Sequence, residues 1–171
     1  MTVDTKLNID QEYITQYSSK NQEPSWLLEL RLRGLENSKV LDLPKLDKTK
    51  IDKWNILQFT HVVEEEAIST LDTLPEEVKS LIGSGETAGN IVIHKNSSAI
   101  YSTLTQELKD KGVIFTDIKT AARQHSELLS KYLMNSVVKV DEHKVSALHA
   151  ALFNCGIFLY CLLYTSPSPR D

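Results

Sequence analysis

The sequence lacks the features that mark secreted, membrane-bound or nucleic-acid-binding proteins. Its two cysteines, Cys155 and Cys161, lie near the C-terminus and are too few for a disulfide framework. No apolar run is long enough to cross a bilayer, and residues 1–10 contain no apolar core of a secretory signal. The formal charge of −4 comes without a cluster of Lys and Arg for nucleic acid or an anionic membrane. We therefore expect a cytoplasmic protein without nucleic-acid or membrane partners.

The composition does supply enough apolar residues for a folded core. Of the 171 residues, 41% are hydrophobic and 25% are charged, as in ordinary globular proteins. This length suits one domain, or a domain with an appendage. Segments with helical spacing outnumber short β-branched segments, and the sequence contains no internal repeat. The expected fold class is a helix-rich α+β fold.

The N-terminal segment predicts two helices. Asp10 can cap a helix over residues 10–18, and Pro24 stands just before a second helix over residues 26–37. In the second helix, Gly34 costs about 1 kcal/mol relative to alanine. One apolar face of this helix carries Leu28, Leu32 and Leu35, widened by Leu27 and Leu30.

The next part of the chain predicts a connector, a short helix and a β-hairpin. Residues 40–55 alternate charged and apolar side chains, which indicates an extended connector pinned by Leu43, Ile51 and Trp54. A short strand over residues 56–63 precedes a short helix that starts at Pro75. Residues 90–94 and 99–103 flank a turn over residues 96–98, which is typical of a hairpin.

The C-terminal half predicts helices and short strands in alternation. A helical turn over residues 106–111 ends at Gly112, and a strand follows over residues 113–115. Two further helices follow, one capped by Thr116 or Asp117 and one capped by Ser126. Residues 143–153 form an amphipathic helix that ends at Gly156, with an apolar stripe of Val145, Leu148 and Leu152. Residues 157–160 then begin a strand that we expect to have no partner.

The last eleven residues, 161–171, do not continue this pattern. They read Cys-Leu-Leu-Tyr-Thr-Ser-Pro-Ser-Pro-Arg-Asp, which resembles, codon by codon, the translation of a transposase adapter used in sequencing libraries. The alternative is a native tail rich in serine and proline. On the adapter interpretation the natural reading frame is lost near Tyr160, and Cys161 is not a native cysteine.

Three segments, in this order, resemble the SufB/SufD family of iron–sulfur cluster assembly scaffold proteins. The first, residues 19–33, contains the element Glu23-Pro24-Ser25-Trp26, which opens a helix with a downstream arginine. The second is Lys48-Thr49-Lys50-Ile51-Asp52-Lys53-Trp54, which favours a SufD-like over a SufB-like chain. The third, residues 143–160, resembles the entry from a helix into the first strand of the family's core. The chain departs from the family at Gly34, where alanine is usual.

The resemblance implies a scaffold subunit that is cut short after its N-terminal part. Residues 1–55 would form N-terminal helices and a connector, and residues 56–153 a small α+β domain. Residues 154–160 would start a truncated right-handed parallel β-helix, followed by the non-native residues 161–171.

The partners that the resemblance implies are a SufB-like subunit and a SufC-type ABC ATPase, as in a SufBCD complex. The regions that would bind them are mostly missing from this chain. Cluster or iron ligands would lie beyond residue 160. We therefore expect no enzyme, no cofactor in this fragment, and no catalytic, cofactor-binding or metal-binding residue within it.

Two motifs that could suggest chemistry are better explained as structure. The run Gly83-Ser84-Gly85-Glu86-Thr87-Ala88-Gly89 follows a helix and lacks the lysine of a phosphate-binding loop, which indicates a connector. His143, His149 and Cys155 are spaced by six residues, which places them on different sides of a helix rather than around a metal. We expect surface or half-buried histidines and a small buried cysteine. A sulfur-handling role for Cys155 is the less favoured alternative.

The acidic and aromatic residues also favour structural roles. Glu64-Glu65-Glu66 and Glu76-Glu77 are consecutive and their side chains diverge, so we expect a solvated face rather than paired catalytic carboxylates. His61 and His94 are isolated, and Trp26 and Trp54 are expected to anchor short elements by packing. Two alternatives stay open: a small stand-alone α/β enzyme, and a regulatory binding module. A concave pocket with perturbed ionisable residues would favour the enzyme.

Overall fold

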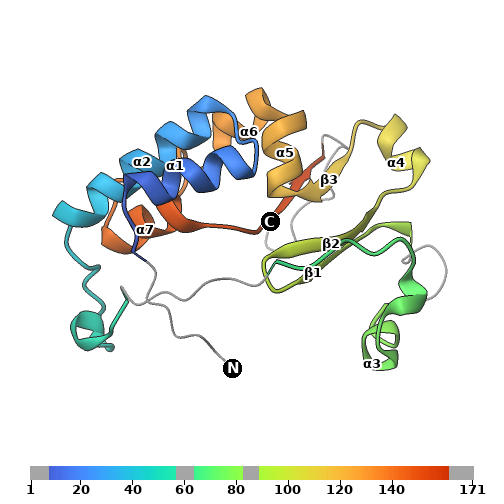
Figure 1. The fold of residues 1–171 in the computed structure, drawn as a ribbon, viewed down its shortest axis with the longest axis horizontal. Helices are drawn as coiled ribbons and strands as arrows, with labels where there is room; N and C mark the ends of the chain where they lie inside the picture. Colours follow the sequence, from blue (N-terminus) through green and yellow to red (C-terminus); the bar gives the residue numbers. More distant parts are fainter. Residues whose placement is uncertain (1–7, 57–63, 83–88, 162–171) are drawn as a thin grey trace, which may run out of the picture. The chain divides into compact units, whose positions relative to one another are not determined.

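The computed structural model describes residues 8–56, 64–82 and 89–161. It combines helices with two antiparallel two-stranded sheets, which confirms the expected α+β class (Figure 1). The chain divides into two units, Met1–Val62 with Lys119–Asn154 and Val63–Ile118 with Cys155–Asp171, so it passes between them three times. Several expectations lie outside the described residues. They are the strand over residues 56–63 except Ile56, His61, the glycine-rich run except Gly89, and the tail after Cys161.

Helices α1 (Gln11–Lys20) and α2 (Ser25–Val40) confirm the first two predicted helices. The Asp10 side chain accepts a hydrogen bond from the Tyr13 amide at 2.8 Å, which satisfies one of the free donors at the start of α1. Pro24 is the N-cap of α2, where its missing N–H leaves no bond unmade. Helix α2 runs beyond the predicted end, to Val40.

The buried face of α2 contains part of the predicted leucine face. Its buried residues are Leu27, Leu30, Arg31, Gly34, Leu35 and Ser38, so three of the five predicted leucines are confirmed. Leu28 and Leu32 are half-buried and pack, on the side of α1, against Ile14 and Leu35. Each fully buried leucine or isoleucine contributes about 1.5–3 kcal/mol relative to an exposed one. The sequence pattern therefore predicted the buried leucines of α2 in part, but not Arg31, Gly34 and Ser38 on the same face.

Helix α7 (Lys144–Leu152) packs against α2, and its buried residues are mostly small, together with Leu148 of the predicted stripe. Its buried residues are Ser146, Ala147, Leu148, Ala150 and Ala151, whereas Val145 is 39% exposed. A Cβ atom at Gly34 would lie 2.6 Å from the Ala147 carbonyl oxygen and 2.9 Å from the Ala151 amide nitrogen. Gly34 thus permits the close approach of two helix backbones, and its local helix cost is offset by that packing.

Of the three expected anchors of the connector after α2, Leu43 is half-buried, Ile51 is buried and Trp54 is exposed. Ile51 begins the 3₁₀ helix η1 (Ile51–Lys53) and is 8% exposed, as predicted. Trp54 is 60% exposed, so the expectation that it anchors the connector is wrong. Trp54 follows η1 directly, so it lies outside the turn whose first residue, Ile51, faces the core. The connector is also held by a hydrogen bond from the Lys144 amide to the Asp42 carbonyl at 2.9 Å.

Helices α5 (Ile118–Gln124) and α6 (Ser126–Tyr132) lie where they were predicted. His125, not Ser126, occupies the N-cap position of α6. The Ser126 hydroxyl instead accepts a hydrogen bond from the Trp26 indole N–H at 2.7 Å. Trp26 therefore ties the start of α2 to the start of α6, which confirms its anchoring role.

The second unit contains the predicted hairpin and two short helices. Strands β1 (Ile91–Lys95) and β2 (Ser98–Thr103) pair antiparallel, with Asn96 at φ 52° in the turn. Helices α3 (Glu76–Lys79) and α4 (Gln106–Asp110) follow Pro75 and Thr105, and a 3₁₀ helix η2 (Leu71–Thr73) precedes α3. Gly112 ends the α4 segment at φ 78°, the left-handed conformation that glycine adopts without strain.

Strand β4 (Ile157–Tyr160) is not the lone strand that was predicted. It pairs antiparallel with β3 (Ile114–Asp117), in a register that places Ile114 opposite Tyr160. The sequence pattern does not reveal this pairing because β3 is remote from β4 in sequence, with α5, α6 and α7 between them. Ile157 and Leu159 remain 56% and 63% exposed, so one face of β4 is both apolar and open.

Candidate functional site

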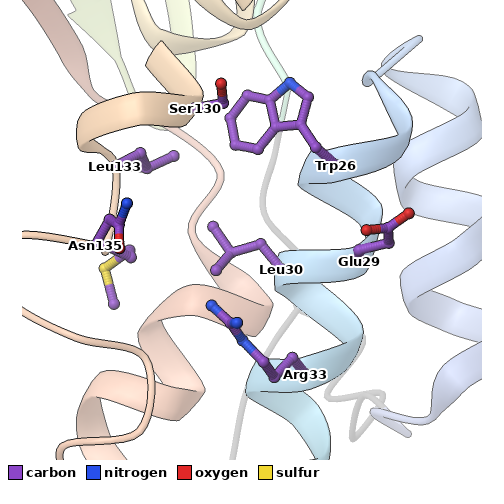
Figure 2. Close-up of a pocket in the computed structure, with 8 residues that line it drawn as sticks. Trp26, Glu29, Leu30, Arg33, Ser130, Leu133 and Asn135 are labelled. Atoms are coloured by element: carbon purple, nitrogen blue, oxygen red, sulfur yellow. The ribbon is translucent and has the colours of Figure 1, made fainter. Parts of the chain in front are cut away.

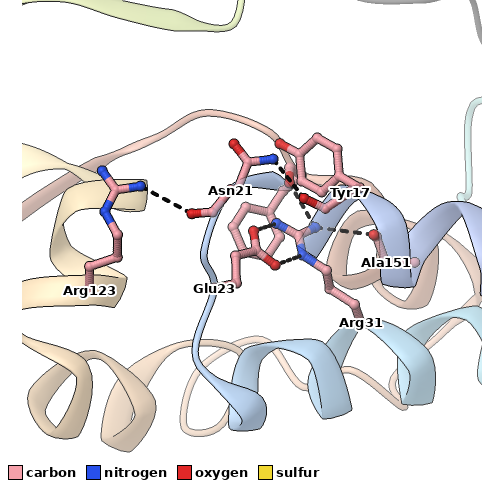
Figure 3. Close-up of polar contacts among 7 residues, drawn as sticks. Tyr17, Asn21, Glu23, Arg31, Arg123 and Ala151 are labelled. Carbon is pink, nitrogen blue, oxygen red and sulfur yellow. Dashed lines mark hydrogen bonds and ion pairs between the residues drawn. The ribbon is translucent and has the colours of Figure 1, made fainter. Parts of the chain in front are cut away.

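The most elaborate polar arrangement in the first unit surrounds Arg31, a buried arginine on α2. Its guanidinium forms a two-pronged pair with Glu23, with Nε–Oε2 at 2.7 Å and Nη2–Oε1 at 2.6 Å (Figure 3). The two side chains are 1% and 3% exposed, so the pair is almost completely withdrawn from water. This parallel geometry is the strongest form of arginine–carboxylate contact.

The third arm of the guanidinium reaches the end of α7. Nη1 donates to the carbonyl oxygens of Ala151 at 3.1 Å and Phe153 at 2.9 Å (Figure 3). Carbonyls in the last turn of a helix have no intrahelical donor and need another partner when buried. Arg31 therefore satisfies backbone groups that lie more than a hundred positions later in the chain.

Two aromatic rings flank the same guanidinium. Its Cζ lies 4.2 Å from the ring centre of Phe153 and 5.0 Å from that of Tyr17. Lys119 Nζ lies 5.7 Å from the Tyr17 ring centre. Cation–π contacts of this kind are strongest where water is excluded, as it is around Arg31.

The loop between α1 and α2 holds Glu23 in place. The Glu23 amide donates to the Ser18 carbonyl at 3.0 Å, and the Asn21 side chain donates to the Tyr17 carbonyl at 2.8 Å. Arg123 of α5 donates to the Asn21 carbonyl at 3.1 Å (Figure 3). The loop that carries the Glu23 carboxylate is thus joined by hydrogen bonds to both α1 and α5.

The contacts of this cluster indicate a structural role, in which Arg31 fixes the positions of its partners, rather than a reactive one. The donors of Arg31 are taken up by the Glu23 carboxylate and two backbone carbonyls. Removing one member of a buried ion pair costs about 3–5 kcal/mol because the other charge is left without compensation. We call Glu23, Arg31, Ala151 and Phe153 the arginine cluster.

The arginine cluster was missed at the sequence level, although its signal was present. The Glu-Pro-x-Trp element with its downstream arginine was noted only as a resemblance. Arg31 lies four residues after Leu27 and four before Leu35, both buried, so it stands on the apolar stripe of α2. An arginine at such a position has to be paired in the folded chain.

A cleft of about 380 Å³ lies beside the outer part of α2 (Figure 2). Leu30 and Leu133 point toward each other across it, and Glu29 points away (Figure 2). Its lining residues are Trp26, Glu29, Leu30, Arg33, Ser130, Leu133, Met134 and Asn135. The lining contains no histidine, cysteine or aspartate, and its one carboxylate, Glu29, points away from the cleft that Ser130 lines (Figure 2).

A second hollow, of about 310 Å³, lies on the outer face of α7. It is lined by Ile56, Val145, Leu148, His149, Leu152 and Phe153. The His149 ring stacks on Phe153, with 6.0 Å between ring centres. This hollow includes the predicted apolar stripe, of which Leu148 is buried and Leu152 packs against the core, whereas Val145 is exposed.

The predicted histidine and cysteine candidates have separate surroundings. His143 Nδ1 accepts a hydrogen bond from the Ser146 amide at 3.0 Å, and the Ser146 hydroxyl accepts one from the His143 amide at 3.1 Å. His143 is therefore the cap of α7. Cys155 is exposed, which corrects the expectation of a buried cysteine; it lies in the segment between α7 and β4. Among the described residues, no three His, Cys, Asp or Glu side chains are grouped as metal ligands would be.

The acidic runs mostly form the solvated face that was predicted. Glu64, Glu66, Glu76 and Glu77 are exposed. Glu65 is half-buried and pairs with Lys95 at 2.9 Å and with the Asn96 amide at 2.8 Å. The hydrogen bond from Lys95 lowers the pKa of Glu65, which keeps this carboxylate ionised. His94 is half-buried in β1, and its Nε2 has no hydrogen-bond partner among the described residues.

No described helix is long and apolar enough to cross a membrane. This finding concerns only the residues that the structure describes.

Comparison with known proteins confirms the resemblance that the three sequence segments indicated. The chain is 53% identical to the iron–sulfur cluster assembly protein SufD of Bacillus subtilis over 161 residues, which is 94% of this chain. It is 29% identical to an iron–sulfur cluster assembly SufBD family protein of Pyrococcus horikoshii over 94% of this chain, and 29% identical to one of Staphylococcus saprophyticus over 89%. The chain spans 37% of the length of the first two relatives and 34% of the third. No family model matches the chain.

Proposed function

We propose that this chain is the N-terminal part of a SufD-type scaffold subunit that serves iron–sulfur cluster assembly in the cytoplasm. The observation that carries the proposal is the 53% identity to SufD over 94% of the chain. That alignment covers nearly every described element, including the arginine cluster. The relatives are much longer than the aligned region, so most of such a subunit lies outside this chain.

In this proposal the described residues supply position rather than chemistry. The first unit has a buried ion pair and a closely packed α2–α7 contact. Such features fix backbone geometry but do not activate a nucleophile or transfer a proton. We therefore assign no enzymatic activity to this part, and we place the ligands for iron or clusters, which are the cargo, in the region beyond residue 160.

Strand β4 is the proposed point of entry into the rest of the subunit. We assign it to the beginning of a right-handed parallel β-helix, following the family resemblance. Its exposed Ile157 and Leu159 support this assignment because further strands would bury them. The proposed partners, a SufB-like subunit and a SufC-type ATPase, would bind the β-helix and the C-terminal helices that follow it.

A chimera tests the proposal. Residues 1–160 of this chain would replace the aligned part of Bacillus subtilis SufD, and the activity of iron–sulfur enzymes would be measured in cells that lack the native subunit. We expect activity close to that of cells with native SufD, and co-purification of the SufB and SufC proteins. A soluble, folded chimera that captures neither protein and restores no activity would contradict the proposal.

A matched control separates folding from function in this experiment. The same chimera with Arg33→Met changes an exposed arginine on α2 and is expected to work like the parent chimera. The chimera with Arg31→Met is expected to lose activity because Glu23 is left buried without its partner.

A further inference from the structure

Helix α7 ends without the backbone cap that its sequence predicts. The residue after its last turn, Phe153, is extended at φ −57° and ψ 136°. Gly156, the expected stop signal, lies beyond it and does not adopt a left-handed conformation. Because a Schellman or left-handed cap is missing, the carbonyls of the last turn need donors from elsewhere.

Arg31 supplies those donors from another helix. One nitrogen, Nη1, bonds the carbonyl of Ala151 inside the last turn and that of Phe153 just after it. The guanidinium also places a positive charge at the negative end of the α7 dipole. Phe153 closes over the same group at 4.2 Å, so both the backbone and the side chain at the end of α7 contact Arg31.

This contact lies where the chain leaves the first unit. Asn154 is the last residue of the first unit, and the chain enters the second unit at Cys155. Arg31 therefore contacts the last turn of α7 and the residue after it, just before the chain passes between the units for the third time. Glu23, which pairs with the charge of Arg31 and orients its guanidinium, belongs to the loop that joins α1 and α2.

We propose that the arginine cluster is a latch that fixes where the chain leaves the first unit. The latch closes only when the loop between α1 and α2 is folded, because without Glu23 the buried guanidinium has no counter-charge. The exit at residues 151–154 is thus coupled to the N-terminal helices rather than determined by α7 alone. Gly34 is part of this device, since it lets α7 approach α2 closely enough for Arg31 to reach both carbonyls.

Hydrogen exchange of the purified 171-residue chain tests the latch. The double variant Glu23→Gln with Arg31→Met removes both charges and the donors to α7 while it keeps similar side-chain volumes. We expect amide exchange in residues 149–155 to rise by about tenfold or more, because the end of α7 opens locally. Exchange in α1 and in the capped first turn of α7 is expected to change by less than about twofold.

Three variants make the test decisive. Arg33→Met, an exposed change on the same helix, is expected to leave exchange at residues 149–155 unchanged. Arg31→Lys keeps the charge but not the fork, and is expected to give an intermediate rise. Unchanged exchange at residues 149–155 in the double variant would overturn the proposal. A uniform rise across α1, α2 and α7 would also overturn it, because the cluster would then stabilise the unit as a whole.

Discussion

Single residues in this chain show how a position can be required for reasons that composition does not reveal. Gly34 and Arg31 both lie on the buried face of α2, where a sequence pattern favours larger apolar side chains. Gly34 is there because a backbone oxygen of α7 occupies the space of a Cβ atom. Arg31 is there because its guanidinium pairs with the Glu23 carboxylate and donates to two backbone carbonyls at the end of α7. Both depend on α7, which is remote in sequence.

Replacing Gly34 by alanine is predicted to destabilise the fold despite the better helix propensity of alanine. The new Cβ would lie 2.6 Å from a backbone oxygen that cannot rotate away, so α7 has to shift. We expect a loss of about 1–3 kcal/mol in the free energy of unfolding, measured by urea denaturation. The matched control is Gly156→Ala, whose Cβ would meet Ile118 at an ordinary 3.5 Å. Equal stability of the Gly34→Ala and Gly156→Ala variants would show that α7 adapts freely.

At the surface, the pair between Glu65 and Lys95 predicts a pH effect that can be followed residue by residue. The hydrogen bond from Lys95 lowers the pKa of Glu65 in the folded chain. The pair therefore stabilises the fold above the ordinary pKa of glutamate, and this contribution is lost as the pH falls through the lowered value. In Lys95→Met, the pKa of Glu65 should rise toward its ordinary value in a carboxyl NMR titration. Lys109→Met is the control and should leave it unchanged.

Elements differ in how far the sequence alone could specify them. Helix α1, the hairpin β1–β2 and the stop at Gly112 were predicted because each depends on neighbours in sequence: a cap, a turn or a left-handed glycine. The inner face of α7 and the partner of β4 were not, because both depend on segments far along the chain. The arginine cluster belongs to the second kind. Its residues were quoted in a motif, but only the fold brings Glu23, Arg31 and Phe153 together.

The start of α7 offers a test at the level of one element. His143 caps the helix through Nδ1, while Ser146 returns the bond to the His143 amide. His143→Ala is predicted to lower the free energy of unfolding by about 1 kcal/mol, as loss of a helix cap does. His143→Asn keeps an acceptor at this position and should retain most of the stability. A thermal denaturation series would decide, since equal effects of both changes would mean that the cap contributes little.

Strand β4 predicts self-association of the isolated chain. Ile157 and Leu159 form an exposed apolar face on a strand with one described neighbour. We expect light scattering after size exclusion to show species larger than a monomer, and the double change Ile157→Thr with Leu159→Thr to reduce them. Val137→Thr alters a 92% exposed valine elsewhere and should have no such effect. A monodisperse monomer of the unchanged chain would contradict this prediction.

At the scale of the whole molecule, our proposal treats the described residues as positioning elements of a longer subunit. Its two units are interleaved in sequence, so neither unit is one continuous segment of the chain. The curated relatives extend well beyond the aligned part, and in our proposal the working surfaces of the scaffold lie in that extension.

The central claim is that this polypeptide is the first part of a longer SufD-type subunit. An independent sequencing read of the source DNA, carried through the codon for Tyr160, tests it most directly. The account predicts that the reading frame leaves the sequence of residues 161–171 and continues into a region similar to the remainder of SufD. A read that reproduces residues 161–171 and then reaches a stop codon after Asp171 would contradict it.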